Sequence, residues 1–332
     1  MHLNFEVNKH VLLTGAGCTR NFGGFLANEM WAWIFNDSNI EKNHQLKGLV
    51  KTDFDYESIY YKVIDGIGFN DDEKKALKGA VYSAYKKLDD KIRSLGTNQL
   101  VCINEFSKFI ERFSGYPAST GRNDTKGFFF TLNQDLFIER YCSPPNFKPI
   151  TLYVPQPKLS QDEVYDENIH SVNLPSIADI EQINPLSSTK FFYVKLHGSW
   201  NWYSSDGKKR MVIGRNKINQ INTEPVLLRY FEIFKEVLSK GDVRLFVIGY
   251  GFRDEHINDT IADAIMNNNL KLYVLNPSNP EMFKNDFHSD KIFRGEIIWN
   301  GLAGYYPYNL SQVFPGAETV EYELIRDSYF DS

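Results

Sequence analysis

The chain has 332 residues, enough to bury a large core and to hold two domains. Lys and Arg number 37 and Asp and Glu 42, so the formal net charge is −5, which argues against a general nucleic-acid binder with a basic face. No apolar run reaches the ~18 residues of a membrane span, and the N-terminus lacks the pattern of a signal peptide. The cysteines, Cys18, Cys102 and Cys142, lie too far apart for a metal pair or a disulfide framework. We therefore expect a cytoplasmic protein.

The N-terminal segment predicts a buried strand, a glycine turn and a helix. Residues 11–14 are apolar, and Gly15, Ala16 and Gly17 follow them. Apolar residues then recur at helical spacing: Phe22, Leu26, Met30 and Ile34. Glycines let a backbone approach a pyrophosphate, and a helix N-terminus supplies free N–H groups. The third glycine of the dinucleotide fingerprint is not at its usual spacing, so an ordinary tight turn is the alternative.

Further apolar runs predict strands that are buried on both faces. They cover residues 127–132, 191–196, 243–248, 271–275 and 294–299. None alternates cleanly between apolar and polar residues, which is typical of a parallel sheet covered by helices. Residues 225–239 and 254–268 have helical patterns between these strands. The sequence thus predicts an α/β fold: a Rossmann-like parallel sheet with helices on both faces and a helical insertion.

Residues 1–36 and 126–300 form this predicted Rossmann-like domain. Residues 37–125 break its rhythm and carry helical patterns, so we expect a helical insertion or small domain there; the patterns lie at 57–65, 71–95 and 99–113. Residues 141–190 are rich in Pro, Asn, Ser and Asp, which predicts a mostly irregular insertion near the site. Residues 301–332 are expected to pack as a C-terminal extension.

Polar residues or glycines follow the predicted strands directly. The segments are Thr131-Leu132-Asn133-Gln134-Asp135, Lys195-Leu196-His197-Gly198-Ser199, Ile248-Gly249-Tyr250-Gly251-Phe252-Arg253-Asp254 and Val274-Leu275-Asn276-Pro277. In open α/β sheets ligands bind at the carboxyl ends of the strands, so these segments should converge on one crevice. Asp254 is expected to cap the helix after it. Arg253 and His256 begin that helix and are expected to face solvent or a partner subunit.

Taken in order, these segments resemble the sirtuins and the wider prokaryotic sirtuin-like domains. The resemblance runs from about residue 10 to 280. It implies that Gly15-Ala16-Gly17 holds the pyrophosphate of NAD⁺ and that Thr131-Leu132-Asn133-Gln134-Asp135 lines the nicotinamide-ribose pocket. It makes His197 the catalytic histidine, and it gives the Gly249-Tyr250-Gly251 turn and Asn276 to the adenosine half.

Two departures from the sirtuin pattern indicate which branch of this family the sequence resembles. No cysteine lies between His197 and Gly249, so we expect no zinc module and no other metal. The Pro-Asp-Phe-Arg string after the first turn is missing, and Arg20, Asn21 and Phe22 stand near its place. Both departures resemble the bacterial sirtuin-like branch that hydrolyses NAD⁺ in anti-phage defence. Many members of that branch act beside, or are fused to, a second component such as a HerA-type ATPase or a short Argonaute, so the resemblance implies such a partner and a homo-oligomer.

We therefore expect NAD⁺ to be the substrate and Asn133, Asp135 and His197 to be catalytic. His197 has a side chain that titrates naturally near neutrality, so it can activate water or a ribose hydroxyl. The expected cofactor-binding residues are Gly15, Ala16, Gly17, Cys18, Phe22, Thr131, Gly249, Gly251 and Asn276.

Structural roles remain alternatives for several of these residues. His197 can be a satisfied core histidine, Asn133 and Asp135 can form a turn, and Cys18 can be simply buried. Two other functions also stay open. One is an NAD-dependent protein deacylase or ADP-ribosyltransferase, and the other is a non-catalytic nucleotide sensor.

Overall fold

A seven-stranded sheet with the order β10-β9-β8-β1-β2-β5-β3 forms the centre of the molecule, and all its pairings are parallel. Its strands are β1 (Val7–Thr14), β2 (Lys126–Thr131), β3 (Ile150–Thr151), β5 (Phe191–Lys195), β8 (Arg244–Ile248), β9 (Lys271–Leu275) and β10 (Leu302–Tyr306). The computed structural model describes residues 6–95, 100–114, 125–142, 150–155, 159–182, 191–204 and 206–331.

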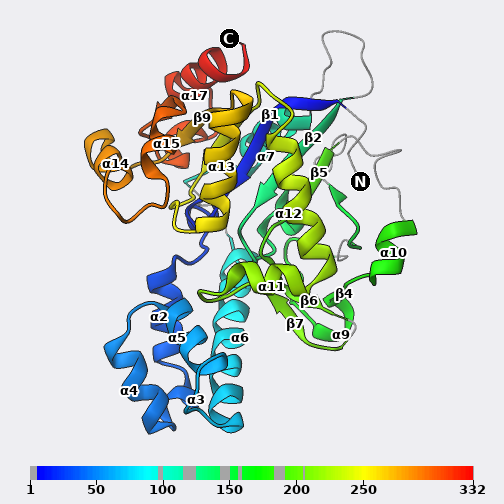
Figure 1. Ribbon diagram of the computed structural model, residues 1–332, viewed down its shortest axis with the longest axis vertical. Coiled ribbons are helices and arrows are strands. Elements are labelled where there is room, and N and C mark those ends of the chain that lie inside the picture. Colours follow the sequence, from blue (N-terminus) through cyan, green and yellow to red (C-terminus); the bar gives the residue numbers. More distant parts are fainter. Residues whose placement is uncertain are drawn as a thin grey trace.

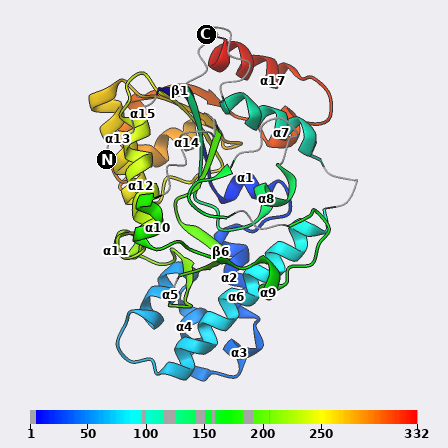
Figure 2. The ribbon, with the colours of Figure 1, turned by 90° about the vertical axis from the view of Figure 1, so that its right-hand side faces the viewer.

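Helices cover both faces of this sheet. Successive residues of a strand point to opposite faces, and Leu12 and Leu13 accordingly lie in two separate apolar cores, both fully buried. Helices α12 (Pro225–Leu238) and α13 (Glu255–Asn268) cover one face (Figure 1). Helices α7 (Ile103–Glu111) and α17 (Val320–Ile325) lie on the other (Figure 2). The Rossmann-like α/β prediction is confirmed.

A group of helices, here called the helical lobe, lies beyond one end of the sheet at the bottom of Figures 1 and 2. It consists of α2 (Ala27–Phe35), α3 (Ser38–Glu41), α4 (His44–Thr52), α5 (Tyr56–Ile64) and α6 (Asp71–Arg93). Helix α7 was expected in the same insertion, but it packs on the sheet, where Phe109 contacts the ring of Phe246 at 5.5 Å between centroids. Among the described residues, no helix is both long and apolar enough to cross a membrane.

The strand predicted at residues 294–299 is wrong. Residues 294–299 were expected as a strand, but they lie mainly in helix α15 (Gly295–Asn300). Gly295 and Ile298 are the buried residues of α15, a spacing of three that suits a helix and not a strand. The next sheet strand is β10, which comes from the predicted C-terminal extension.

The predicted amphipathic segment after the first turn is also interrupted. Helix α1 (Ala16–Arg20) ends early, and α2 begins only at Ala27. Gly23 has a φ of +80°, and a Cβ on Gly24 would lie 2.8 Å from the side chain of Thr19. This pair of glycines turns the chain, so the apolar spacing of this segment spans two helices.

A small second sheet, β4-β6-β7, adjoins the main one. It contains β4 (Val172–Asn173), β6 (Gly198–Tyr203) and β7 (Lys209–Met211). The described part of the 141–190 region contributes β3, β4, α9 (Glu167–His170) and α10 (Ile177–Gln182), with irregular segments between them. Residues 143–149, 156–158 and 183–190 of that prediction lie outside the described residues.

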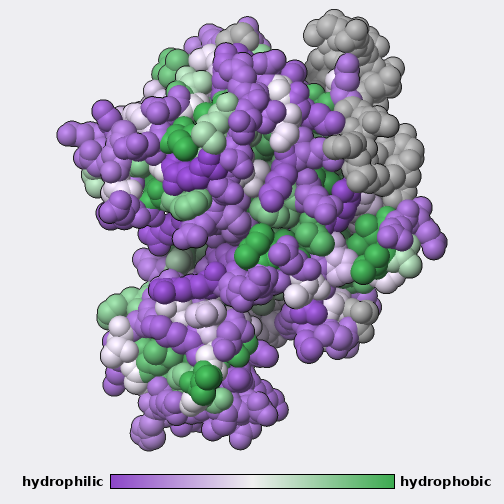
Figure 3. All heavy atoms as spheres, in the orientation of Figure 1, coloured by the Kyte–Doolittle hydropathy of each residue, from purple (hydrophilic) through white to green (hydrophobic). Residues whose placement is uncertain are grey.

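The remaining helices are short and connect these layers. They are η1 (Arg112–Ser114), α8 (Phe137–Tyr141), α11 (Lys217–Thr223), α14 (Pro280–Phe287), α16 (Leu310–Val313) and η3 (Arg326–Phe330). On the face shown in Figure 3, hydrophilic residues predominate and apolar ones gather in small separate groups.

Candidate functional site

The carboxyl ends of five strands are aligned in register. Thr14 at the end of β1 lies opposite Thr131 of β2 and Ile248 of β8. Thr131 in turn lies opposite Lys195, and Ile248 lies opposite Leu275. All five polar segments that the sequence singles out therefore begin at one edge of the sheet.

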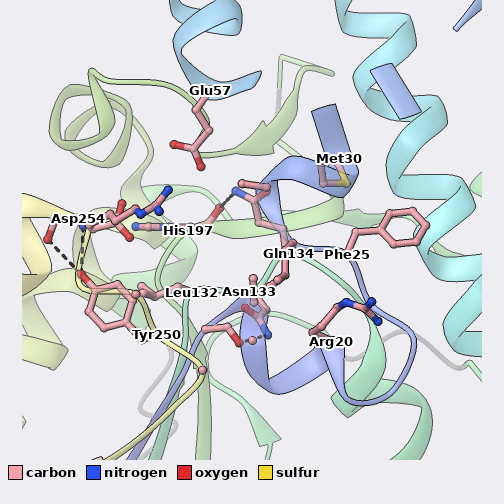
Figure 4. A pocket seen from close by; sticks show the side chains of 18 of the residues that line it. Arg20, Phe25, Met30, Glu57, Leu132, Asn133, Gln134, His197, Tyr250 and Asp254 are labelled. Atoms are coloured by element: carbon pink, nitrogen blue, oxygen red, sulfur yellow. Dashed lines mark hydrogen bonds between the residues drawn. The ribbon is translucent and has the colours of Figure 1, made fainter. Parts of the chain in front are cut away.

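A cavity of about 1290 Å³ opens at this edge. This exceeds the ~300–1,000 Å³ of typical small-ligand pockets, so the cavity has room for a dinucleotide. Residues of all five segments line it: Gly15, Ala16, Gly17, Asn133, Asp135, His197, Gly249, Gly251 and Asn276. The helical lobe supplies an opposite wall, which includes Met30 and Glu57 (Figure 4).

The two glycine turns touch each other through their backbones. The N–H of Gly15 donates to the carbonyl of Ile248 at 3.0 Å, and the N–H of Gly17 donates to that of Gly249 at 2.9 Å. Gly249 has a φ of +65°, and a Cβ there would lie 2.0 Å from the backbone nitrogen of Cys18. These two N–H groups, which were expected to face a pyrophosphate, are bonded within the chain. The glycines are therefore needed first for the contact between the turns.

Asn133 joins the second segment to the first. Its Nδ2 donates to the carbonyl of Gly15 at 3.1 Å (Figure 4). The same Nδ2 also donates to Oγ1 of Thr19 at 2.6 Å. Both amide hydrogens are thus used, which leaves Oδ1 as the atom that can accept from a ligand. Thr131 lies outside the cavity lining: it is 1% exposed and its hydroxyl accepts from Thr14 at 2.8 Å. The role of Thr131 is therefore to join the carboxyl ends of β1 and β2.

Asp135 combines a turn with a place in the cavity wall. Its Oδ1 accepts from the N–H of Phe137 at 3.0 Å, the turn that was the structural alternative. Burial raises the pKa of Asp135 to about 6, although Lys195 and the Phe137 N–H act in the opposite direction. The neighbouring Gln134 donates to the carbonyls of His197 and Val212 at 3.1 and 2.8 Å, and so ties this segment to the third.

His197 is 4% exposed and lies directly beside a second histidine. Its Nε2 lies 3.0 Å from Nε2 of His256, which begins helix α13. Burial lowers the pKa of His197 well below its ordinary value and that of His256 to about 4, although Asp254 opposes both shifts. Both imidazoles are therefore neutral at neutral pH, the form that a general base needs. His256 is only partly buried and also lines the cavity, so its side chain faces the space at this edge of the sheet.

Lys217 bridges the site to the helical lobe. Its Nζ lies 2.6 Å from Oδ1 of Asp254 and 2.7 Å from Oε2 of Glu57 on α5. Burial opposes the charge on Asp254, but His197 and Lys217 outweigh it and lower the pKa of Asp254 to about 2. Asp254 was expected to cap α13; it stands at the N-cap, but its side chain makes no capping bond.

The side chains of His197, Asp254 and His256 lie close enough to hold a metal ion, since their ligand atoms are within 4.8 Å of one another. The ammonium of Lys217, however, already contacts the carboxylate of Asp254.

Besides Thr131, two further predicted cofactor-binding residues lie in the core and not at the cavity. Cys18 is 2% exposed, and burial raises the pKa of its thiol well above the ordinary value. Phe22 is 1% exposed and stacks on Phe137 at 4.2 Å between ring centroids. Neither side chain lines the cavity. Gly23 and Gly24 turn the chain after Phe22, so Phe25 reaches the cavity instead (Figure 4).

The adenosine-side residues lie at the far end of the same edge. Gly251 and Asn276 both line the cavity. Oδ1 of Asn276 accepts from the N–H of Ser278 at 2.8 Å, and its own N–H donates to the carbonyl of Tyr306 at 3.1 Å. Asn276 therefore forms a local turn, which leaves its Nδ2 to face a ligand.

The fold places the chain among the open parallel α/β proteins, in which ligands bind in a crevice at the carboxyl ends of the strands, where this cavity lies. The family model described as SIR2-like domain matches residues 127–294, which is about half of the chain. The chain therefore belongs to the SIR2-like family, consistent with an enzyme that uses NAD⁺. The match covers the segments of Asn133, His197 and Gly249 and begins after the first glycine turn. None of the curated proteins matches this sequence.

The contact between the glycine turns can be tested by substitution. Gly249→Ala should lower the free energy of unfolding by more than about 2 kcal/mol, because its Cβ would overlap backbone atoms and its φ is positive. Gly251→Ala is the matched control, since no atom lies within 4 Å of the Cβ position, and it should change stability by less than about 0.5 kcal/mol. Denaturant unfolding of both variants measures this difference; equal stabilities would contradict it.

Asp135→Asn should stabilise the protein at pH 7.5 by on the order of 2 kcal/mol. The pKa of Asp135 is about 6 in the folded chain, against an ordinary value of 3.8 for the unfolded one, so stability is lost as the pH rises from 3.8 through 6. An amide keeps the acceptor for the Phe137 N–H without the cost of a buried charge. The gain should vanish below pH 4, as measured by denaturant unfolding across pH. Asp290→Asn, at an exposed position, is the control.

Proposed function

We propose that the protein is an NAD⁺ glycohydrolase, which uses water to cleave the nicotinamide–ribose bond and releases nicotinamide and ADP-ribose. The observation that carries this proposal is the meeting of Asn133, Asp135 and His197 with both glycine turns at one cavity, in a chain of the SIR2-like family. The size of the cavity supports a substrate as large as a dinucleotide.

Cleavage of the nicotinamide–ribose bond gives the ribose an oxocarbenium-like charge. Asp135 is ionised above pH 6, so its carboxylate can stabilise that positive charge. Oδ1 of Asn133 is free to orient the water or a ribose hydroxyl, and neutral His197 can take the proton. Apolar side chains in the cavity wall, among them Met30 of the lobe and Phe25 just before it, would limit access of other water molecules.

The remaining segments would hold the rest of the substrate. The Gly15–Gly17 turn and the start of α1 would take the pyrophosphate, with the positive charge of Arg20 close by in the cavity wall. The Gly249–Gly251 turn and Asn276 would take the adenosine end. Nicotinamide would then lie between Asn133 and His197.

We further propose that this activity depletes NAD⁺ during bacterial anti-phage defence. The proposal rests on the sequence resemblance to the NAD⁺-hydrolysing sirtuin-like branch. A homo-oligomer and a partner such as a HerA-type ATPase would belong to the same system. Because uncontrolled hydrolysis would harm the host, we expect a gate, and the Glu57–Lys217 contact between lobe and site is a candidate for it.

Purified protein, alone and with the product of the neighbouring gene, should release nicotinamide from NAD⁺ without any acylated peptide. His197→Ala and Asn133→Ala should each lower this release by roughly 10²–10⁴, the usual contribution of a positioned base or orienting group. Liquid chromatography of nicotinamide and ADP-ribose measures the rate.

His288→Ala and Asn285→Ala, both exposed on the structure, are the controls for these substitutions. Unfolding midpoints should be recorded for every variant, because Asn133 also holds Gly15 and Thr19. Strict dependence on an acylated peptide would make the protein a deacylase. Tight NAD⁺ binding without turnover under any condition would make it a sensor.

A further inference from the structure

The contact between His197 and His256 requires a shared proton. Their Nε2 atoms lie 3.0 Å apart, which is a hydrogen-bond distance. A bond between two neutral imidazoles places one hydrogen between these nitrogens. The pair then keeps one free lone pair, on Nδ1 of one ring, while Nδ1 of the other carries a hydrogen. The two rings together therefore act as a single base.

The surroundings of the pair favour the movement of positive charge from one ring to the other. His197 is 4% exposed, whereas His256 is only half-buried and also lines the cavity. The charged groups that face the pair are Asp254 and Lys217 for both rings and Lys235 of α12 for His256. The ring of Phe231 packs edge-on against His256 at 5.5 Å between centroids. Asp254 is the acidic group among these neighbours, and it can balance an imidazolium on either ring.

We propose that His197 and His256 form a proton-transfer pair in which His256 carries protons between His197 and solvent. This inference rests on the proposed NAD⁺ hydrolysis. An O–H bond of the attacking water or of a ribose hydroxyl breaks, and its proton joins Nδ1 of His197. The proton on Nε2 of His197 then passes to Nε2 of His256, which becomes the imidazolium. Hydrolysis of NAD⁺ releases one proton overall, and His256 loses it to solvent; exchange with water restores the starting tautomers.

A shared proton fits the geometry better than a shared metal ion. The carboxylate of Asp254, which would complete a metal site, accepts through Oδ1 from the ammonium of Lys217 at 2.6 Å. That ammonium is held in place by Glu57 as well, so the positive charge beside Asp254 is already supplied by the chain.

Substitution of His256 separates proton transfer from simple positioning. Glutamine can keep a hydrogen bond to His197 but cannot pass a proton, whereas alanine can do neither. His256→Ala and His256→Gln should both lower the kcat of nicotinamide release about 10- to 100-fold, with the KM for NAD⁺ unchanged. Added imidazole should restore part of the activity of His256→Ala. The control is His288→Gln, on the exposed surface of the protein. Wild-type activity in His256→Gln would overturn the proposal.

A spectroscopic measurement tests the pair without turnover. In protein labelled with ¹⁵N-histidine, a scalar coupling between the two Nε2 nuclei should be seen by NMR, and it should be absent in His256→Ala. If the coupling is present but wild-type protein leaves NAD⁺ intact, the proposed function fails while the shared proton stands. If wild-type protein hydrolyses NAD⁺ and shows no coupling, the pair is wrong and the proposed function stands. A tightly bound divalent metal whose removal by a chelator separates the two rings would also overturn it.

Discussion

The backbone contact between two glycine turns, one near residue 16 and the other near residue 250, is the constraint on which the site depends. The Gly17 N–H reaches the carbonyl of Gly249, and a Cβ on either residue would overlap the other turn. This contact brings the ends of β1 and β8 together at the floor of the cavity. Asn133 then bonds to the carbonyl of Gly15, so the second segment is positioned by the first. One close approach thus sets the places of three motifs.

Burial and one lysine together set the electrostatics of this edge of the sheet. Desolvation keeps His197 and His256 neutral, and it raises the pKa of Asp135 to about 6. Lys217 keeps Asp254 ionised beside the two rings and also binds Glu57 of the helical lobe. The lobe is therefore linked to the charges of the site through a single ammonium group, and its position bears directly on the chemistry of the imidazole pair.

The strands and their polar ends could be predicted because both signals are local. An apolar run followed by Asn133 or His197 marks a buried strand and its carboxyl end without knowledge of the fold. The role of His256 could not be predicted in this way, because its partner lies 59 residues away in the chain. Phe22 was misplaced for a related reason: helical spacing does not reveal that Gly23 turns the chain. The short run at 294–299 fits a strand and a helix equally well until its neighbours are known.

The position of β1 decides which fragments of this protein can exist. It lies in the middle of the main sheet and bonds to β2 on one side and to β8 on the other. A truncated protein limited to residues 127–294, the family-matched region, would lack β1. Strands β2 and β8 would then have no strand between them, and the sheet would be divided into two groups with new unpaired edges. Dissection of the protein must therefore retain the β1 strand and the glycine turn after it, even though they precede the recognisable domain by about a hundred positions.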